Sequence, residues 1–150
     1  MRVVLIGYMG SGKTTLGDAL AEHLCVPFVD LDVEIEKSLS MSVSQIIEEK
    51  GELYFRKQEH ERLLAVLEEA PEAMVLAVGG GTPVFFDHMT VLNEWGETVF
   101  LDVGIGELAN RLQQDTTRPL IQNQDDVMEF VAKHLFERRP FYSQAKRRIR

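Results

Sequence analysis

The sequence predicts an α/β fold in which helices cover both faces of a parallel sheet. Short apolar stretches rich in β-branched residues alternate with segments of helical spacing, beginning with 2–6 and the segment from Lys13. The predicted strands are apolar on both faces, as expected of a sheet that is buried from two sides. The chain has 150 residues, enough for one core, so we expect a single domain over residues 1–150.

The first helix is expected to begin at Lys13 and to end before Pro27. Leu16, Leu20 and Leu24 are spaced four apart, which predicts that they form its buried face. Cys25 is expected to be a small core residue on this helix, without chemistry of its own.

Ser42 and Gln45 predict a capping box at the start of another helix, which Gly51 ends. A longer helix with Phe55 and Leu63 is expected after that glycine. The other predicted elements are strands at 27–30, 74–78 and 98–102, a helix with Leu108 and Leu112, a polar loop at 113–124, and a last helix that ends near Pro140.

Composition argues against several classes of partner. Aspartate and glutamate outnumber lysine and arginine by 24 to 16, a net charge of −8, which disfavours nucleic acid or an anionic membrane as the main partner. No apolar run is long enough to cross a bilayer. A single cysteine cannot form an internal disulfide, so a cytoplasmic location is expected.

The segment 7–14 fits the phosphate-binding pattern G-x-x-x-x-G-K-[ST], between a predicted strand and a predicted helix. Its glycines let backbone N–H groups converge on phosphate oxygens at a helix N-terminus. Lys13 is expected to bridge the β- and γ-phosphates of ATP, and Thr14 to be a direct Mg²⁺ ligand. The predicted nucleotide-binding residues of this loop are Gly10, Ser11, Gly12, Lys13, Thr14 and Thr15.

Asp30 and Asp32 follow the second predicted strand. In an extended stretch alternate residues share a side, so both carboxylates could face one pocket and serve phosphoryl transfer to an alcohol. The alternative is that one of them only caps the helix that follows.

Three consecutive glycines, 79–81, directly follow a predicted strand and offer bare backbone N–H groups to a ligand. Arg56 and Arg138 could together hold a planar carboxylate. Arg118 lies in the polar loop 113–124, which we expect to close over ATP so that this arginine can neutralise phosphate charge. For each arginine alone, an ordinary solvated position is the competing interpretation.

In the order in which they occur, these segments resemble the shikimate kinase family along essentially the whole chain. The phosphate-binding loop is shared by many kinases, whereas the ordered set is specific to this family. The segments that carry the resemblance are 7–14, 30–32, 51–59, 79–81, 118–120 and 138–142.

The resemblance implies Mg²⁺-dependent transfer of the ATP γ-phosphate to the 3-hydroxyl of shikimate, a step towards chorismate and the aromatic amino acids. It implies a nucleoside-monophosphate-kinase-like fold of the P-loop NTPase type, a three-layer αβα arrangement with a five-stranded parallel sheet. The site residues that it implies are Asp32 as substrate ligand and base, Asp30 on Mg²⁺ through water, Arg56 and Arg138 on the carboxylate, Gly79, Gly80 and Gly81 on the substrate, Arg118 on the phosphates, and Arg111 against the adenine.

Family members usually continue beyond the position of Arg150 with the rest of a last strand, an adenine-contacting loop and a final helix, which are expected to be missing here. The expected kinase domain thus consists of a core, 1–112 and 125–150, and the loop 113–124. A monomer is expected. The rival interpretations are another small-molecule P-loop kinase, such as a gluconate kinase, and a non-catalytic nucleotide-binding module.

Overall fold

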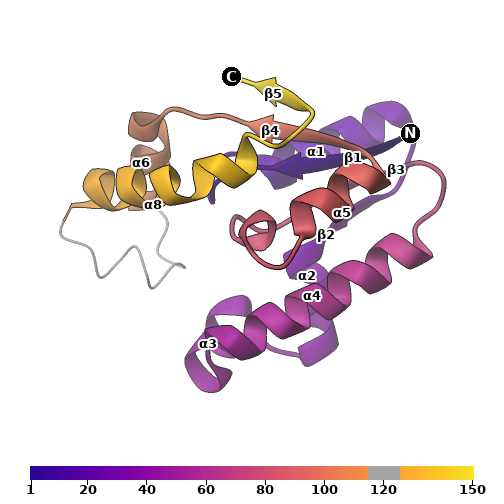
Figure 1. The fold of residues 1–150 in the computed structure, drawn as a ribbon, viewed down its shortest axis with the longest axis horizontal. Helices are drawn as coiled ribbons and strands as arrows, with labels where there is room; N and C mark the ends of the chain where they lie inside the picture. The colour runs from indigo at the N-terminus through magenta and orange to yellow at the C-terminus, as the bar shows by residue number, and fades with distance from the viewer. Residues whose placement is uncertain (115–125) are drawn as a thin grey trace.

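A five-stranded parallel sheet forms the centre of the molecule, in a computed structural model that describes residues 1–114 and 126–150 (Figure 1). The spatial order is β2-β3-β1-β4-β5, and every neighbouring pair is parallel. This confirms the predicted sheet. The strands are β1 (Arg2–Ile6), β2 (Phe28–Asp30), β3 (Met74–Ala77), β4 (Glu97–Leu101) and β5 (Arg147–Ile149).

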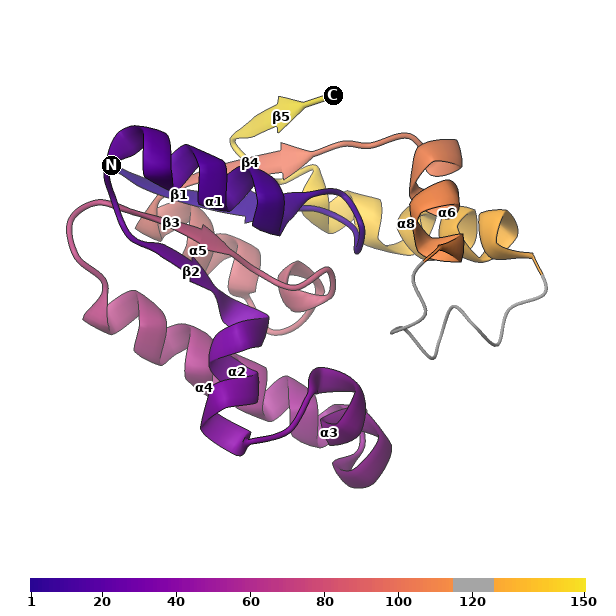
Figure 2. The same ribbon diagram turned by 180° about the vertical axis from the view of Figure 1, so that it is seen from behind.

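Helices pack on both faces of the sheet, as the strand composition predicts. Successive strand residues point to opposite faces, so Val4 and Ile6 join one core cluster while Val3 and Leu5 join the other. Helix α1 (Lys13–Leu24) lies on one face, and α5 (His88–Trp95) and α8 (Val127–Tyr142) lie on the opposite face (Figures 1 and 2). The result is the three-layer αβα arrangement.

The buried face of α1 differs from the predicted one. Gly17 and Ala21 are its buried residues, whereas Leu16 and Leu24 are 39% and 42% exposed. A Cβ at Gly17 would overlap the ring of Phe28, so the helix approaches the sheet too closely for larger side chains. The prediction was therefore wrong for Leu16 and Leu24, whereas Leu20 is partly buried and packs against the core.

Cys25 is also placed differently from the prediction. It is exposed and adopts a left-handed conformation (φ 57°) as the C-cap of α1, with its N–H bonded to the carbonyls of Ala21 and Glu22. It belongs to the helix end and not to the core.

Three helices form a unit beside β2: α2 (Leu31–Leu39), α3 (Val43–Lys50) and α4 (Glu52–Glu69). The predicted capping box is confirmed, because Gln45 N donates to Ser42 Oγ at 3.1 Å and Ser42 N to Gln45 Oε1 at 2.9 Å. Gly51 ends α3 with φ 91°, a conformation that favours glycine. The chain then turns into α4, as predicted.

The second half of the chain adds the 3₁₀ turn η1 (Thr82–Val84), α5 and α6 (Ile105–Gln113) before α8. Helix α5 was not predicted. Pro140 lies inside α8, which ends two residues after the predicted position. The predicted loop 113–124 lies outside the described residues except for Gln113, the last residue of α6, and Gln114. Among the described residues, no helix is long and apolar enough to span a membrane.

Candidate active site

The phosphate-binding loop connects β1 to α1. Gly10 (φ 80°) and Gly12 (φ 94°) take left-handed conformations, which allow the tight curvature of the loop. Gly12 caps α1 without a side-chain hydrogen bond, so the N–H groups of the first helical turn can serve an anion. The ammonium of Lys13 donates to the carbonyls of Gly7 (2.7 Å) and Tyr8 (2.9 Å), which holds it at the loop.

Two carboxylates lie at the start of α2, beside the end of this loop. Asp30 is the N-cap of α2, where it accepts from Val33 N at 3.3 Å, and it also accepts from the Thr14 hydroxyl at 2.8 Å. Asp32 is the second residue of α2 and not part of an extended stretch. The predicted alternation therefore does not explain their common side. The first turn of a helix does, and the capping alternative holds for Asp30.

The pKa of Asp32 is raised from 3.8 to about 6, first by burial and then by the negative charges of Asp30 and Glu59. Lys13 opposes this shift. A carboxylate with a pKa near neutrality can be ionised at physiological pH and still accept a proton effectively. Such a shift in a cleft is characteristic of functional carboxylates.

The glycine loop 79–81 leaves room for three functional side chains. A Cβ at Gly79 would lie 3.1 Å from Asp32 Oδ1, one at Gly80 would lie 3.0 Å from Arg138 Nη1, and one at Gly81 would lie 2.5 Å from Arg56 Nη2. Each glycine thus permits the close approach of one predicted substrate-binding residue. The absence of side chains here is therefore a packing requirement.

Arg56 is held in a buried position on α4. Its Nη1 donates to Glu59 Oε1 at 2.9 Å, and its guanidinium carbon lies 4.2 Å from the centre of the Phe85 ring. Its Nε is buried and has no hydrogen-bond partner among the described residues. Glu59 is 1% exposed and also accepts from the Thr82 hydroxyl at 2.8 Å. A buried guanidinium with unused donor capacity suits an anionic ligand.

Arg138 approaches the same loop from α8. Its guanidinium carbon lies 5.7 Å from the centre of the Tyr8 ring, within the range of cation–π attraction. Tyr142, one turn further along α8, donates its hydroxyl to Gly80 O at 2.5 Å. This hydrogen bond connects α8 to the glycine loop one turn away from Arg138.

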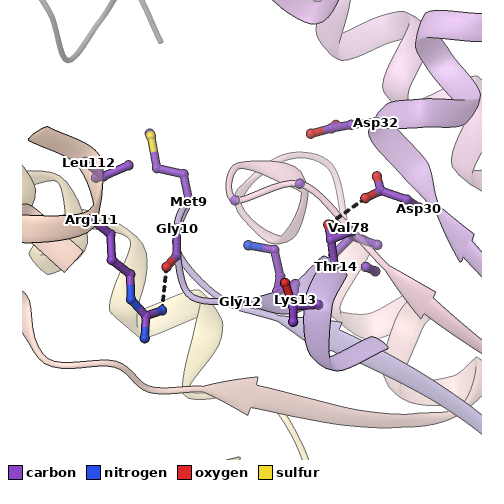
Figure 3. A pocket seen from close by; sticks show the side chains of 14 residues that line it. Met9, Gly10, Gly12, Lys13, Thr14, Asp30, Asp32, Val78, Arg111 and Leu112 are labelled. Carbon is purple, nitrogen blue, oxygen red and sulfur yellow. Dashed lines mark hydrogen bonds between the residues drawn. The ribbon is translucent and has the colours of Figure 1, made fainter. Parts of the chain in front are cut away.

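A cleft of about 440 Å³ connects these features (Figure 3). Figure 3 shows Arg111 at one end and Asp30 and Asp32 at the other, with Lys13 between them. Arg111 donates to Gly10 O at 2.8 Å and to Glu107 at 2.9 Å. The residues that line the cleft are Met9, Gly10, Gly12, Lys13, Thr14, Thr15, Asp30, Asp32, Ala77, Val78, Gly79, Gly80, Arg111 and Leu112.

Most predicted site residues are therefore brought together. Gly81, Arg56 and Arg138 do not line the cleft itself but adjoin its wall at the glycine loop. Ser11 is buried within the phosphate-binding loop. Arg118 lies outside the described residues.

Sequence reasoning gave no role to the residues that support the arginines. Glu59, one helical turn after Arg56, and Thr82, directly after the glycines, are buried polar residues with shared hydrogen bonds. The spacing of three between Arg56 and Glu59 could have indicated an ion pair on one helix face. Thr82 offered no comparable signal, because its contact with Glu59 is tertiary.

Thr14 and Asp30 also meet the requirements of a magnesium site. The Thr14 hydroxyl and the Asp30 carboxylate supply hard oxygen donors 2.8 Å apart at the foot of the phosphate-binding loop, beside Lys13. Mg²⁺ commonly takes few protein ligands and keeps several waters, so two such oxygens are sufficient.

The fold and the site define a P-loop phosphotransferase with a carboxylate-lined acceptor wall. Residues 9–150 match the family model described as shikimate kinase. The shikimate kinase of Phocaeicola vulgatus is 47% identical over 97% of this chain and 83% of its own length. This chain belongs to the shikimate kinase family.

Solved structures agree with this assignment. The crystal structure of shikimate kinase from Bacteroides thetaiotaomicron has a TM-score of 0.93 at 43% identity and covers 99% of this chain and 85% of its own. That of Acinetobacter baumannii in complex with shikimate has a TM-score of 0.91 at 33% identity over 99% and 82%. A gluconokinase from Sinorhizobium meliloti, with a TM-score of 0.53 at 20% identity over 91% and 73%, shares the fold alone.

Proposed function

We propose that this chain transfers the γ-phosphoryl group of ATP to the 3-hydroxyl of shikimate, giving shikimate 3-phosphate and ADP. Membership of the shikimate kinase family supports this substrate pair. The observation that carries the proposal is the convergence of Asp32, Arg138 and Arg56 on the three glycines next to the phosphate-binding loop. This grouping combines a hydroxyl-orienting carboxylate with two guanidinium groups for a planar carboxylate.

In this mechanism Asp32 orients the 3-hydroxyl and accepts its proton as the oxygen attacks the γ-phosphorus. The bond from that phosphorus to the β–γ bridging oxygen breaks, and ADP leaves. Lys13 offsets the charge of the transferring group, and Arg118 is proposed to do the same from the loop 113–124. Arg111 is proposed to lie against the adenine, beside Gly10.

Thr14 would bind Mg²⁺ directly, and Asp30 would bind it through water. The metal would offset negative charge on the β- and γ-phosphates. Removal of divalent metal by chelation is expected to abolish ADP release, and added Mg²⁺ to restore it.

Arg56 and Arg138, which we call the carboxylate clamp, would fix the acid group of the substrate so that its hydroxyl reaches Asp32. A gluconate kinase would share the fold but not require this arrangement with the triple glycine. A non-catalytic nucleotide-binding module would not require an Asp32 poised near neutrality.

One assay separates the three functions: release of ADP from ATP and Mg²⁺ with shikimate, with gluconate, or with neither. The proposal expects ADP release only with shikimate, and mass spectrometry should find one phosphate added to the acid. Turnover with gluconate alone would favour the sugar-acid kinase, and absence of turnover with both acids would favour the binding module.

A further inference from the structure

Two histidines form a pair behind the carboxylate clamp, outside the residues that line the cleft. His88 is 1% exposed at the start of α5, and its Nδ1 lies 2.8 Å from the carbonyl oxygen of Thr82. Its Nε2 lies 2.9 Å from Nδ1 of His60 on α4. The His60 ring stacks on Phe86, with ring centres 4.0 Å apart and an angle of 13° between planes.

These contacts determine where the protons lie. A carbonyl oxygen can only accept, so Nδ1 of His88 must carry hydrogen. In the neutral ring Nε2 of His88 is then the acceptor, and Nδ1 of His60 must be the donor. Both histidines are therefore Nδ1–H tautomers when neutral. A proton added to the remaining nitrogen of His60 leaves both hydrogen bonds intact.

The pair is connected to Arg56 of the clamp through two residues, Thr82 and Glu59. Thr82 accepts from His88 with its carbonyl oxygen and donates its hydroxyl to Glu59 at 2.8 Å. Glu59 accepts from Arg56 at 2.9 Å. Thr82 also follows Gly81, where an added Cβ would lie 2.5 Å from Arg56 Nη2. Thr82 thus contacts the hydrogen-bond partner of Arg56 and adjoins the glycine that packs against the Arg56 guanidinium.

We propose that His88 is a positioning residue for the carboxylate clamp: its hydrogen bond to Thr82 fixes the turn that orients Glu59 and Arg56, and His60 fixes the tautomer of His88. This inference rests on the proposed function, since it assigns the effect to shikimate binding. His88 acts through Thr82 and does not touch the substrate.

The electrostatic surroundings favour a neutral His88. Burial lowers its pKa, and the neighbouring His60 and Arg56 lower it further. The hydrogen bond to Thr82 and the charge of Glu59 oppose the shift without reversing it. A ring that stays neutral keeps its Nε2 available to accept from His60.

The first test compares His88→Asn with His88→Leu. The Asn side-chain nitrogen can replace Nδ1 as donor to Thr82, whereas Leu has a similar volume and no donor. We expect His88→Leu to raise KM for shikimate by about tenfold and to change KM for ATP by less than about twofold. His88→Asn should restore most of the affinity. Equal KM values for Leu and wild type, or equal defects for Asn and Leu, would overturn the inference.

The second test does not depend on turnover. Long-range ¹⁵N–¹H spectra of the intact chain should show His60 and His88 as Nδ1–H tautomers at pH 8. In His60→Phe, which can still stack on Phe86, the His88 signals should broaden or shift as its Nε2 loses its donor. A His88 in the Nε2–H form would overturn the inference. This result is obtained on the wild-type chain, so it holds even if the His88→Leu variant does not fold.

The two tests separate this inference from the proposed function. A wild-type chain without shikimate-dependent ADP release would refute the proposed function, and with it the link to shikimate binding, even if the tautomers are as expected. Normal turnover with unaffected variants would refute only the role of His88.

Discussion

Asp32 lies near two other carboxylates, Asp30 and Glu59, whose negative charges add to the effect of its burial. Arrangements of this kind reduce stability and persist where function requires them. The raised pKa, about 6, means that the folded chain retains this proton at a pH at which an unfolded aspartate, near 3.8, has lost it. The stability contributed by this group therefore falls as the pH rises between those values.

Asp32→Asn is accordingly expected to stabilise the protein while inactivating it. The free energy of unfolding should rise by about 1–2 kcal/mol at pH 8, where the carboxylate is charged, and change little at about pH 4. Urea denaturation at the two pH values measures this, and ADP release should fall by at least about 100-fold. Asp18→Asn, on the exposed side of α1, is the control and should have no such effect at either pH. Destabilisation of Asp32→Asn at pH 8 would contradict the electrostatic account.

Arg56 combines a proposed ligand contact with a structural ion pair, which decides how it should be tested. Arg56→Ala would leave Glu59 buried without its partner, so a loss of activity could reflect unfolding. Arg56→Lys keeps the charge but loses the planar fork. We expect it to raise KM for shikimate by about tenfold or more, with KM for ATP within about twofold.

The matched control for Arg56→Lys is Lys57→Gln, an exposed position next to it on α4. It should leave both KM values unchanged. If Arg56→Lys were to change KM for ATP as much as KM for shikimate, the assignment of Arg56 to the carboxylate clamp would be wrong.

At the scale of elements, the close packing of α1 on the sheet depends on Gly17. A Cβ there would overlap the Phe28 ring and lie 3.2 Å from Leu5 Cδ1. Gly17→Val is expected to lower the free energy of unfolding by about 2 kcal/mol, because the helix must move away from β2. Thermal or urea denaturation measures the change.

Gly106→Val on α6 is the matched control, since within the described part of the chain its Cβ would meet only Met128, at 4.0 Å. We expect a change within about 0.5 kcal/mol, since valine has a higher helix propensity than glycine. Equal effects at the two positions would show that helix propensity, and not the approach of α1 to the sheet, governs both.

Elements with local signals were predicted well from the sequence. The Ser42–Gln45 box and Gly51 mark helix ends through contacts within a few residues, and the structure confirms them. The side that a helix buries is decided by the surface it packs on, which is why two of the three α1 leucines, Leu16 and Leu24, are exposed against expectation. Helix α5, which was not predicted, begins after Asp87, a residue type favoured at N-caps, but the Asp87 side chain makes no cap hydrogen bond there.

At the scale of the whole molecule, the difference between local and tertiary contacts also explains which parts of the site could be predicted. The phosphate-binding loop, the aspartates and the triple glycine directly follow strands, and strands of a parallel sheet end at one edge, so their convergence could be expected. The network from Arg56 to His88 could not, because its central link, from Thr82 to Glu59, joins residues 23 positions apart in the sequence. Sequence motifs therefore predict the residues that touch a ligand more readily than the residues that position those ligand-binding side chains.

The glycine loop 79–81 lies between the phosphate-binding loop and the carboxylate clamp. Substitutions in this loop should therefore affect the binding of ATP, of shikimate, or of both. A Cβ at Gly80 would lie 3.2 Å from Met9 N in the phosphate-binding loop and 3.0 Å from Arg138 on α8. The three atoms nearest to a Cβ at Gly81 would all belong to the Arg56 guanidinium, at 2.5–2.8 Å. Neither glycine has a positive φ, so alanine acts at both positions through steric contact and not through backbone strain.

Gly80→Ala is therefore expected to raise KM for both ATP and shikimate by about tenfold, whereas Gly81→Ala should raise only KM for shikimate to that extent. Steady-state kinetics with each substrate varied at saturation of the other distinguishes the two variants. Circular dichroism should show that both remain folded. A Gly80→Ala variant with normal KM for ATP would mean that the phosphate-binding loop accommodates the added methyl group. The ATP and shikimate sites would then not be coupled through Gly80.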